Sequence, residues 1–134
     1  VDQGRASHVS GALMPTQHPY LYGVTAGVSE GQTLSVVEDV VLAEIDRLQT
    51  GGITAGELAK ALAQLKARFV YDGDSVTDIA HQLGYFETFA SWQAYHDLRN
   101  RLDTVTADQV QQAAARYLVA SNRTIGWFEP QVGA

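Results

Sequence analysis

The order of apolar and polar residues predicts two β-strands near the start of the chain. Residues 20–28 alternate between larger apolar residues and small ones, and a period of two is typical of a strand. A weaker alternation covers residues 6–13. Residues 14–19 contain two prolines, which remove backbone donors and favour a turn or loop. We expect the two strands to pair as a hairpin or at a sheet edge.

After residue 32 the apolar spacing changes to three and four, which is typical of amphipathic helices. Thr33 is the expected N-cap of the first helix, and Gly51 and Gly52 are expected to end it. The later helices also begin at residues suited to capping: Thr54, Ser75, Ser91 and Thr106. Two of these are followed three positions later by Glu or Gln, which predicts capping boxes. The pattern therefore predicts about five helices.

Residues 123–128 alternate again and predict a third strand, in one sheet with residues 20–28. Separate runs of strands and helices indicate the α+β class. We expect an antiparallel or mixed sheet fragment with about five helices packed on one face. The apolar surface that these helices are expected to cover carries four residues: Tyr22, Val24, Ile125 and Trp127.

The predicted sheet is incomplete, because an independently stable sheet generally needs three or more strands with a covered face. The chain also starts at Val1 without an initiator Met. We therefore expect residues 1–134 to be a single partial domain, the later portion of a larger one. Its open strand edge is expected to pair with another copy of the chain.

Composition excludes several classes of function. The formal net charge of -6, with nine Lys and Arg scattered singly, opposes binding to nucleic acid, since no basic stripe offsets the repulsion from phosphate. The absence of cysteine excludes disulfides, thiolate catalysis and Cys-based zinc sites. No run approaches the ~18 apolar residues of a membrane-spanning helix.

The histidines do not form a zinc motif. His8, His18, His81 and His96 include no pair at the four-residue spacing that places two imidazoles on one helical face, and the H-x-x-E-H motif is absent. A cluster of His81 with Asp78 and Glu87 is conceivable, but a polar helix flank is the favoured interpretation. We assign no metal ligand.

Two further candidates for chemistry have structural explanations. Ser75 lies near Asp74 and Asp78, but no base is placed beside it, so helix capping is favoured over a nucleophile. A set of aromatic residues can form either a ligand platform or a core, and core is the commoner outcome at helical spacing. The set is Tyr85, Phe86, Phe89, Trp92 and Tyr95. We assign no catalytic residue, and the substrate-binding residues are left open.

Three segments in order resemble the insulinase/pitrilysin family of zinc peptidases, which includes the mitochondrial processing peptidases. Residues 54–69 are similar to its T-x-x-E-L-x-x-A-x-x-x-L helix. Residues 74–87 are similar to the following helix of bacterial members. Residues 105–110, 116–118 and 122–127 are similar to the closing helix and strand. The resemblance covers essentially the whole chain and implies the later portion of a second domain, which carries no metal.

The resemblance implies that zinc is held in another domain of the parent by H-x-x-E-H and a distant Glu, so no cofactor is expected in this chain. Some members use an Arg and a Tyr of a second domain to hold the substrate. The Tyr position falls here on Ala6 or Ser7 and the Arg position precedes residue 1, so this clamp is absent from the chain. A periplasmic or other extracytoplasmic location is expected by analogy alone.

The resemblance therefore implies a non-catalytic segment of a zinc-dependent metalloendopeptidase that forms chamber wall and inter-domain packing surface. Its partners would be the remaining domains of the same polypeptide or a homologous subunit, and the parent would act on peptides. The alternative is a non-catalytic partner subunit or peptide-binding module of the same fold. A free-standing binding module unrelated to peptidases is a third interpretation.

Overall fold

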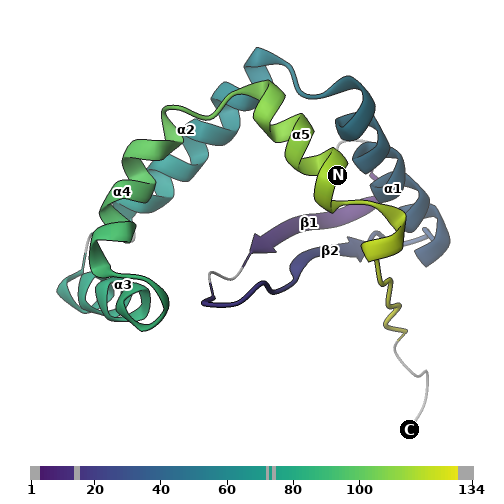
Figure 1. The fold of residues 1–134 in the computed structure, drawn as a ribbon. Helices are drawn as coiled ribbons and strands as arrows, with labels where there is room; N and C mark the ends of the chain where they lie inside the picture. Colours follow the sequence, from purple (N-terminus) through teal and green to yellow (C-terminus); the bar gives the residue numbers. More distant parts are fainter. Residues whose placement is uncertain (1–3, 14–15, 72, 74, 130–134) are drawn as a thin grey trace, which may run out of the picture.

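The computed structural model describes residues 4–13, 16–71, 73 and 75–129. The elements in chain order are β1 (Ala6–Leu13), β2 (Tyr22–Val28), α1 (Leu34–Gly51), α2 (Ala55–Tyr71), α3 (Val76–Phe89), α4 (Trp92–Leu102) and α5 (Ala107–Tyr117), followed by a short 3-10 helix, Ala120–Asn122 (Figure 1). Five helices and an antiparallel strand pair confirm the predicted α+β class.

The two strands form the predicted hairpin. Val9 lies opposite Ala26 and Leu13 lies opposite Tyr22, and paired residues share a face because side chains alternate along each strand. One face therefore carries the apolar side chains: Val9, Leu13, Tyr22, Val24 and Ala26. The second strand begins at Tyr22, two positions later than the alternation predicted, because pairing with β1 ends at Leu13.

Side-chain caps fix most of the predicted helix starts. The Thr33 hydroxyl accepts the Val36 N–H and the Ser75 hydroxyl accepts the Asp78 N–H. Thr106 begins α5 with a complete capping box. Ser91 precedes α4 without a side-chain hydrogen bond of its own. There, Glu87 Oε2 accepts the Trp92 N–H at 2.8 Å, so a residue of α3 satisfies a backbone donor at the start of α4.

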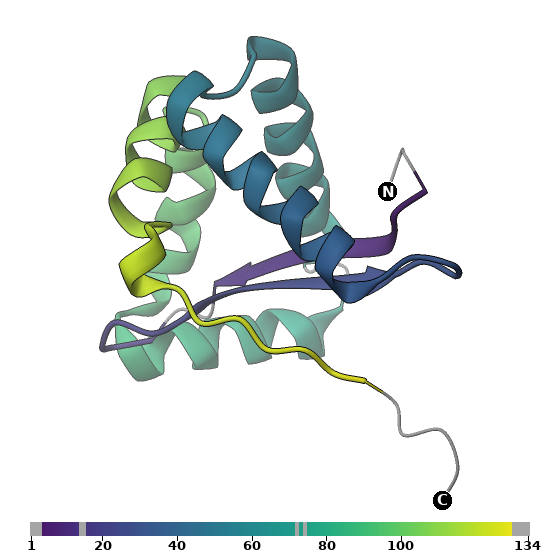
Figure 2. The same ribbon diagram turned by 90° about the vertical axis from the view of Figure 1, so that its right-hand side faces the viewer.

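The helices form an arch above the hairpin (Figure 1). We call β1, β2, α1 and α5 the base, in which α1 packs on β2 and on α5. We call α2, α3 and α4 the arm, in which α4 packs on both α2 and α3. The turned view shows α1 crossing over the hairpin, with the extended C-terminal residues below it (Figure 2). The sheet thus contacts the helices chiefly through α1, and the arm extends beyond it.

The predicted third strand is wrong. Residues 123–128 have no strand pairing, and the sheet found in the described residues consists of β1 and β2. This segment is attached through a side chain instead, since Trp127 Nε1 donates to Glu38 Oε2 of α1 at 2.7 Å. Alternation reports a segment that is suited to a strand, but a strand forms only where an unpaired edge lies alongside it. In the described residues neither β1 nor β2 pairs with this segment.

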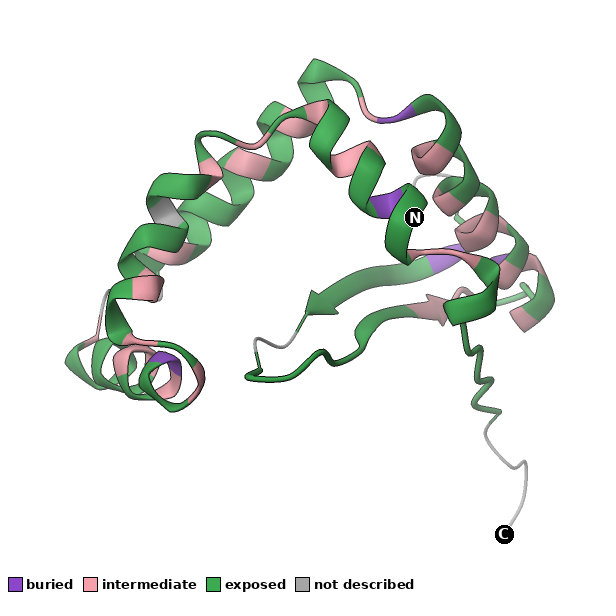
Figure 3. Ribbon diagram, viewed as in Figure 1, coloured by how far each residue is buried: buried purple, intermediate pink, exposed green. Residues whose placement is uncertain are grey.

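Burial is sparse along the whole arch (Figure 3). Among the described residues, the buried apolar ones are Ala6, Val37, Phe86 and Ala114. Ala6, Val37 and Ala114 belong to the base, whereas Phe86 belongs to the arm. The base and the arm therefore each have a small core, and the structure does not place a common core between them.

Candidate functional site

The residues of the possible metal cluster do not come together. Asp78, His81 and Glu87 all lie on α3 and are exposed, and Glu87 is engaged with the Trp92 N–H. Within the described ranges, no group of three or more His, Cys, Asp or Glu residues is placed to hold a metal ion. This part of the chain does not fit a zinc site.

The histidines belong to four separate parts of the fold. His8 lies in β1 and His18 in the following loop, whereas His81 lies in α3 and His96 in α4. His8 Nδ1 lies 3.3 Å from the Ser7 hydroxyl, a contact between chain neighbours. No zinc motif of two helical histidines is formed by these residues.

Ser75 is a capping residue in the structure. Its hydroxyl accepts the Asp78 N–H at 3.4 Å, at the first turn of α3. Asp74, the other acid near Ser75 in the sequence, lies outside the described residues. The capping interpretation of Ser75 is confirmed, and among the described residues no base is found in contact with this hydroxyl.

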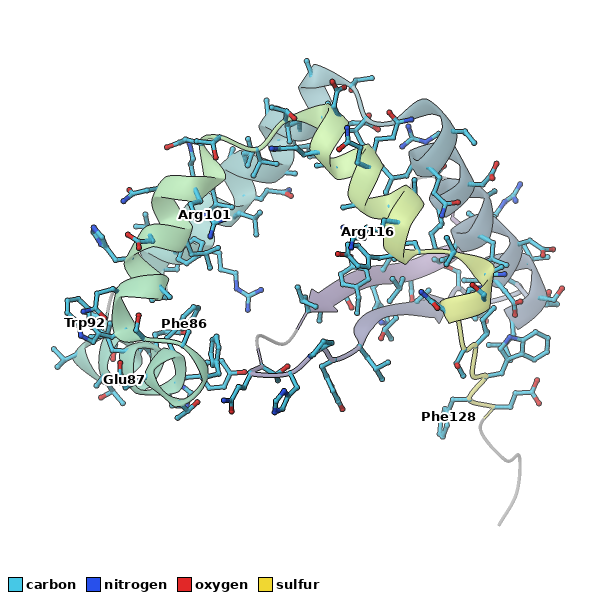
Figure 4. All side chains as sticks on the ribbon, in the orientation of Figure 1. Phe86, Glu87, Trp92, Arg101, Arg116 and Phe128 are labelled. Atoms are coloured by element: carbon cyan, nitrogen blue, oxygen red, sulfur yellow. The ribbon has the colours of Figure 1, made fainter. Side chains whose placement is uncertain are left out.

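The aromatic residues form the core of the arm. The Phe86 ring lies 5.0 Å from Phe89 and 5.2 Å from Tyr95 between centroids. Tyr95 also contacts Phe69 of α2 at 5.7 Å. Figure 4 shows Phe86 at the α3 end of the arch. These distances are typical of packed aromatic pairs, so the core interpretation is confirmed for these rings.

Trp92 differs from the other aromatic residues, because its side chain remains 51% exposed. It lines a depression with Leu83, Gly84 and Glu87 that is open to solvent. A second depression lies between α2 and α4, beside the ion pair of Lys66 and Asp103. In this second depression the two charged lining residues, Lys66 and Asp103, are already paired with each other, so they are not left free to fix a small ligand.

A polar network around Arg47 joins the base to the arm. Arg47 of α1 donates to Glu44 at 2.8 Å and to Glu57 of α2 at 3.1 Å. It also donates to the Gly52 carbonyl at 3.5 Å. Gly52 itself has φ +69°, a left-handed conformation that glycine adopts without steric cost. Arg47 therefore spans the connection between α1 and α2.

Glu57 has two roles at this connection. Its Oε2 accepts the Thr54 N–H at 2.8 Å, and the Thr54 hydroxyl accepts the Glu57 N–H at 3.2 Å, which completes the predicted capping box. Its Oε1 meets Arg47. The backbone hydrogen bond from Thr54 is the largest cause that lowers the pKa of Glu57, followed by the Thr54 hydroxyl, and Arg47 adds to it. The hydrogen bond that Arg47 donates to Glu44 is the largest cause that raises the pKa of Arg47.

Two glutamines tie α1 to α5, and sequence reasoning missed both. Gln49 Nε2 donates to the carbonyls of Ala114 and Leu118. Gln111 Nε2 donates to the carbonyls of Gln49 and Thr50. Their partners lie more than 60 positions away in sequence, so local spacing carried no signal for them.

The position that corresponds to the Tyr of the substrate clamp lies at the start of β1. Ala6 is buried at the start of β1, and the exposed Ser7 follows it. On one face of the hairpin the large side chains are apolar and exposed: Val9 at 49%, Leu13 at 66% and Tyr22 at 51%. The feature of the hairpin that is suited to a partner is therefore an apolar face.

Comparisons with known proteins define the class of fold. No family model and no curated protein matches the chain. A "putative zinc protease from Bordetella pertussis Tohama I" matches over 98% of this chain and 73% of its own, with a TM-score of 0.81 and 26% identity. The "Inactive Peptidase Domain of a Putative Zinc Protease from Bordetella parapertussis" is also similar, with a TM-score of 0.77 and 25% identity. The match covers 98% of this chain and 72% of that chain.

A protease from Helicobacter pylori shows the same fold, with a TM-score of 0.78 and 20% identity. The match covers 88% of this chain and 29% of that protein. The chain thus has the fold of zinc-protease structures, and the resemblance to the insulinase/pitrilysin family is confirmed at the level of the fold. No helix in the described part of the chain is long and apolar enough to cross a membrane.

Proposed function

We propose that residues 1–134 are a partial domain that serves as a non-catalytic structural segment of a zinc-protease-like assembly. In this role the segment forms part of the chamber wall and a packing surface for neighbouring domains. The chemistry would come from zinc held in another part of the parent, because the described residues do not fit a zinc site. No catalytic step is assigned to this chain.

The observation that carries the proposal is the exposed surface. The accessible area is 10454 Å², whereas a compact protein of this mass exposes roughly 6,900 Å². The excess of about 3,500 Å² on this one chain exceeds the area that one partner buries in most obligate interfaces, roughly 1,000–2,500 Å², or half of their total. A chain with this much uncovered surface is suited to packing against a large neighbour.

The character of the exposed surface supports the same role. Large apolar side chains are exposed on the hairpin, on α2 and in the C-terminal segment, including Leu13 at 66%, Val70 at 60% and Phe128 at 87%. Contiguous exposed apolar surface is typical of interaction sites. Because these residues belong to β1, α2 and the segment after α5, they fit a broad packing surface better than a single small-ligand pocket.

The test is to produce this chain alone and together with the polypeptide that its complete gene encodes around it. Alone, it should contain no stoichiometric zinc after dialysis against a weak chelator, and it should cleave no peptide in an unstructured library. Together, the apolar surface should become covered, seen as lost binding of a hydrophobic dye. Stoichiometric zinc in the isolated chain, or dye binding that the rest of the gene product leaves unchanged, would contradict the proposal.

The second candidate function is a non-catalytic partner subunit or peptide-binding module of the same fold. It is favoured by the likeness to a structure described as an inactive peptidase domain. The two candidates differ in whether the remainder of the same polypeptide contains H-x-x-E-H. If the motif is absent there and occurs in a separate subunit that binds this chain, the partner-subunit function is correct.

A further inference from the structure

The base and the arm are two parts of the structure, and each has its own core. In the base, α1 packs on β2 and α5, and in the arm α4 packs on α2 and α3. No pairing of comparable extent between an element of the base and an element of the arm is found in the described residues. Such weakly coupled bodies are the usual setting for hinge motion.

Two short connections join these bodies, and both lie at the top of the arch (Figure 1). The first, residues 52–54, leads from α1 to α2, and the second, residues 103–106, leads from α4 to α5. Each connection runs into a capping box, at Thr54 and at Thr106. Capped helix starts keep the helices intact up to the connection, so changes in backbone angle are confined to a few residues, among them Gly52.

Arg47 and Glu57 stand on opposite sides of the first connection. The Nη2–Oε1 distance is 3.1 Å, and the side chains are 49% and 47% exposed. Arg47 is also held in place on α1 by Glu44, and Glu57 is held at the start of α2 by Thr54. Each charge is therefore fixed to its own helix, so the distance between them depends on the angle between α1 and α2.

We infer that the arch is a hinged device: the arm turns against the base about residues 52–54 and 103–106, and the Arg47–Glu57 pair holds the angle seen here. This inference goes beyond the proposed function, because a packing segment could equally be rigid. The hinge would let the arm follow a neighbouring domain while the base stays fixed.

The chain lacks cysteine, so two spin labels can be introduced without background. We would label Ser35→Cys on α1 and Thr77→Cys on α3, both exposed, and measure the distance distribution by pulsed electron resonance on the full chain. Glu57→Gln keeps a capping-box acceptor and removes the charge that faces Arg47. We expect the population at the wild-type distance to fall, by about fivefold at most, since an exposed ion pair contributes little stability.

The control variants distinguish the Arg47–Glu57 ion pair from other influences on the angle between the arm and the base. Glu44→Gln removes the partner of Arg47 within α1 and should change the distribution less than Glu57→Gln, whereas Arg47→Gln should reproduce the effect of Glu57→Gln. Labels at Ser35 and Gln112, both in the base, should give a narrow distribution in every variant. Identical distance distributions in wild type and Glu57→Gln would overturn the inference that the Arg47–Glu57 pair holds the angle between the arm and the base. A broad Ser35–Gln112 distribution would overturn the rigid base that the hinge requires.

Discussion

Gln111 shows how much a single side chain contributes to the joint between α1 and α5. Its amide donates to the carbonyls of Gln49 and Thr50 at 3.0 and 3.1 Å, two of the last carbonyls of α1, which have no partner within their own helix. Gln111→Ala should therefore lower the free energy of unfolding by about 1–2 kcal/mol. The measurement is urea unfolding followed by helical circular dichroism. Gln112→Ala, at the exposed next position, should change stability by less than half as much.

Phe86 is the residue on which the core of the arm depends. It is 8% exposed and contacts Tyr85, Phe89 and Tyr95. Phe86→Ala should lower the free energy of unfolding by about 3 kcal/mol. This is the lower end of the usual loss for a buried Phe, because the half-buried neighbours can close part of the cavity. Near-ultraviolet circular dichroism during urea unfolding should show the loss of aromatic packing at lower urea. Trp92→Ala, which truncates a half-exposed ring, is the control; an equal loss in both variants would contradict a core role for Phe86.

At the scale of elements, the N-terminus of α2 should make stability depend on pH. The pKa of Glu57 is lowered, first by the Thr54 N–H, so its contribution is present above the usual Glu value near 4.3 and is lost as pH falls through the lower folded value. The melting temperature of the wild-type chain should therefore fall more steeply in this acid range than that of Glu57→Gln. Glu30→Gln makes the same charge change in the loop before α1 and should keep the wild-type slope.

The helix starts were predictable because capping is local. Thr33, Thr54, Ser75 and Thr106 bond to groups within three positions of themselves, so the sequence contains the whole interaction. Residues 123–128 were predicted as a strand and are not one, since pairing depends on what lies alongside. Gln49 and Gln111 were missed for the same reason. The absence of a zinc motif could be read directly from the sequence. The hinge could be inferred only from the way the five helices pack in the structure.

At the scale of the whole molecule, no other strand of the described residues pairs with either edge of the hairpin, and both edges lack the usual protection against association. Neither β1 nor β2 contains a charged residue or a proline, the features that natural edge strands use to prevent pairing with another chain. A two-stranded hairpin is also marginal by itself. We therefore expect the isolated chain to self-associate through this hairpin, and more strongly at high salt, because salt screens the repulsion between copies that each carry a net charge of -6.

The substitution Thr25→Lys tests this expectation, since it places a charge on the polar face of β2, opposite Ser10. Sedimentation velocity over a range of concentrations should show a shift toward monomer in the variant. The substitution makes the net charge less negative, which by itself would weaken repulsion and favour association. A shift toward monomer must therefore come from the edge itself. Thr77→Lys on α3 makes the same change in net charge away from the hairpin and should not favour the monomer. A wild-type chain that is monomeric at every concentration and salt would show that the hairpin edges are not available for pairing.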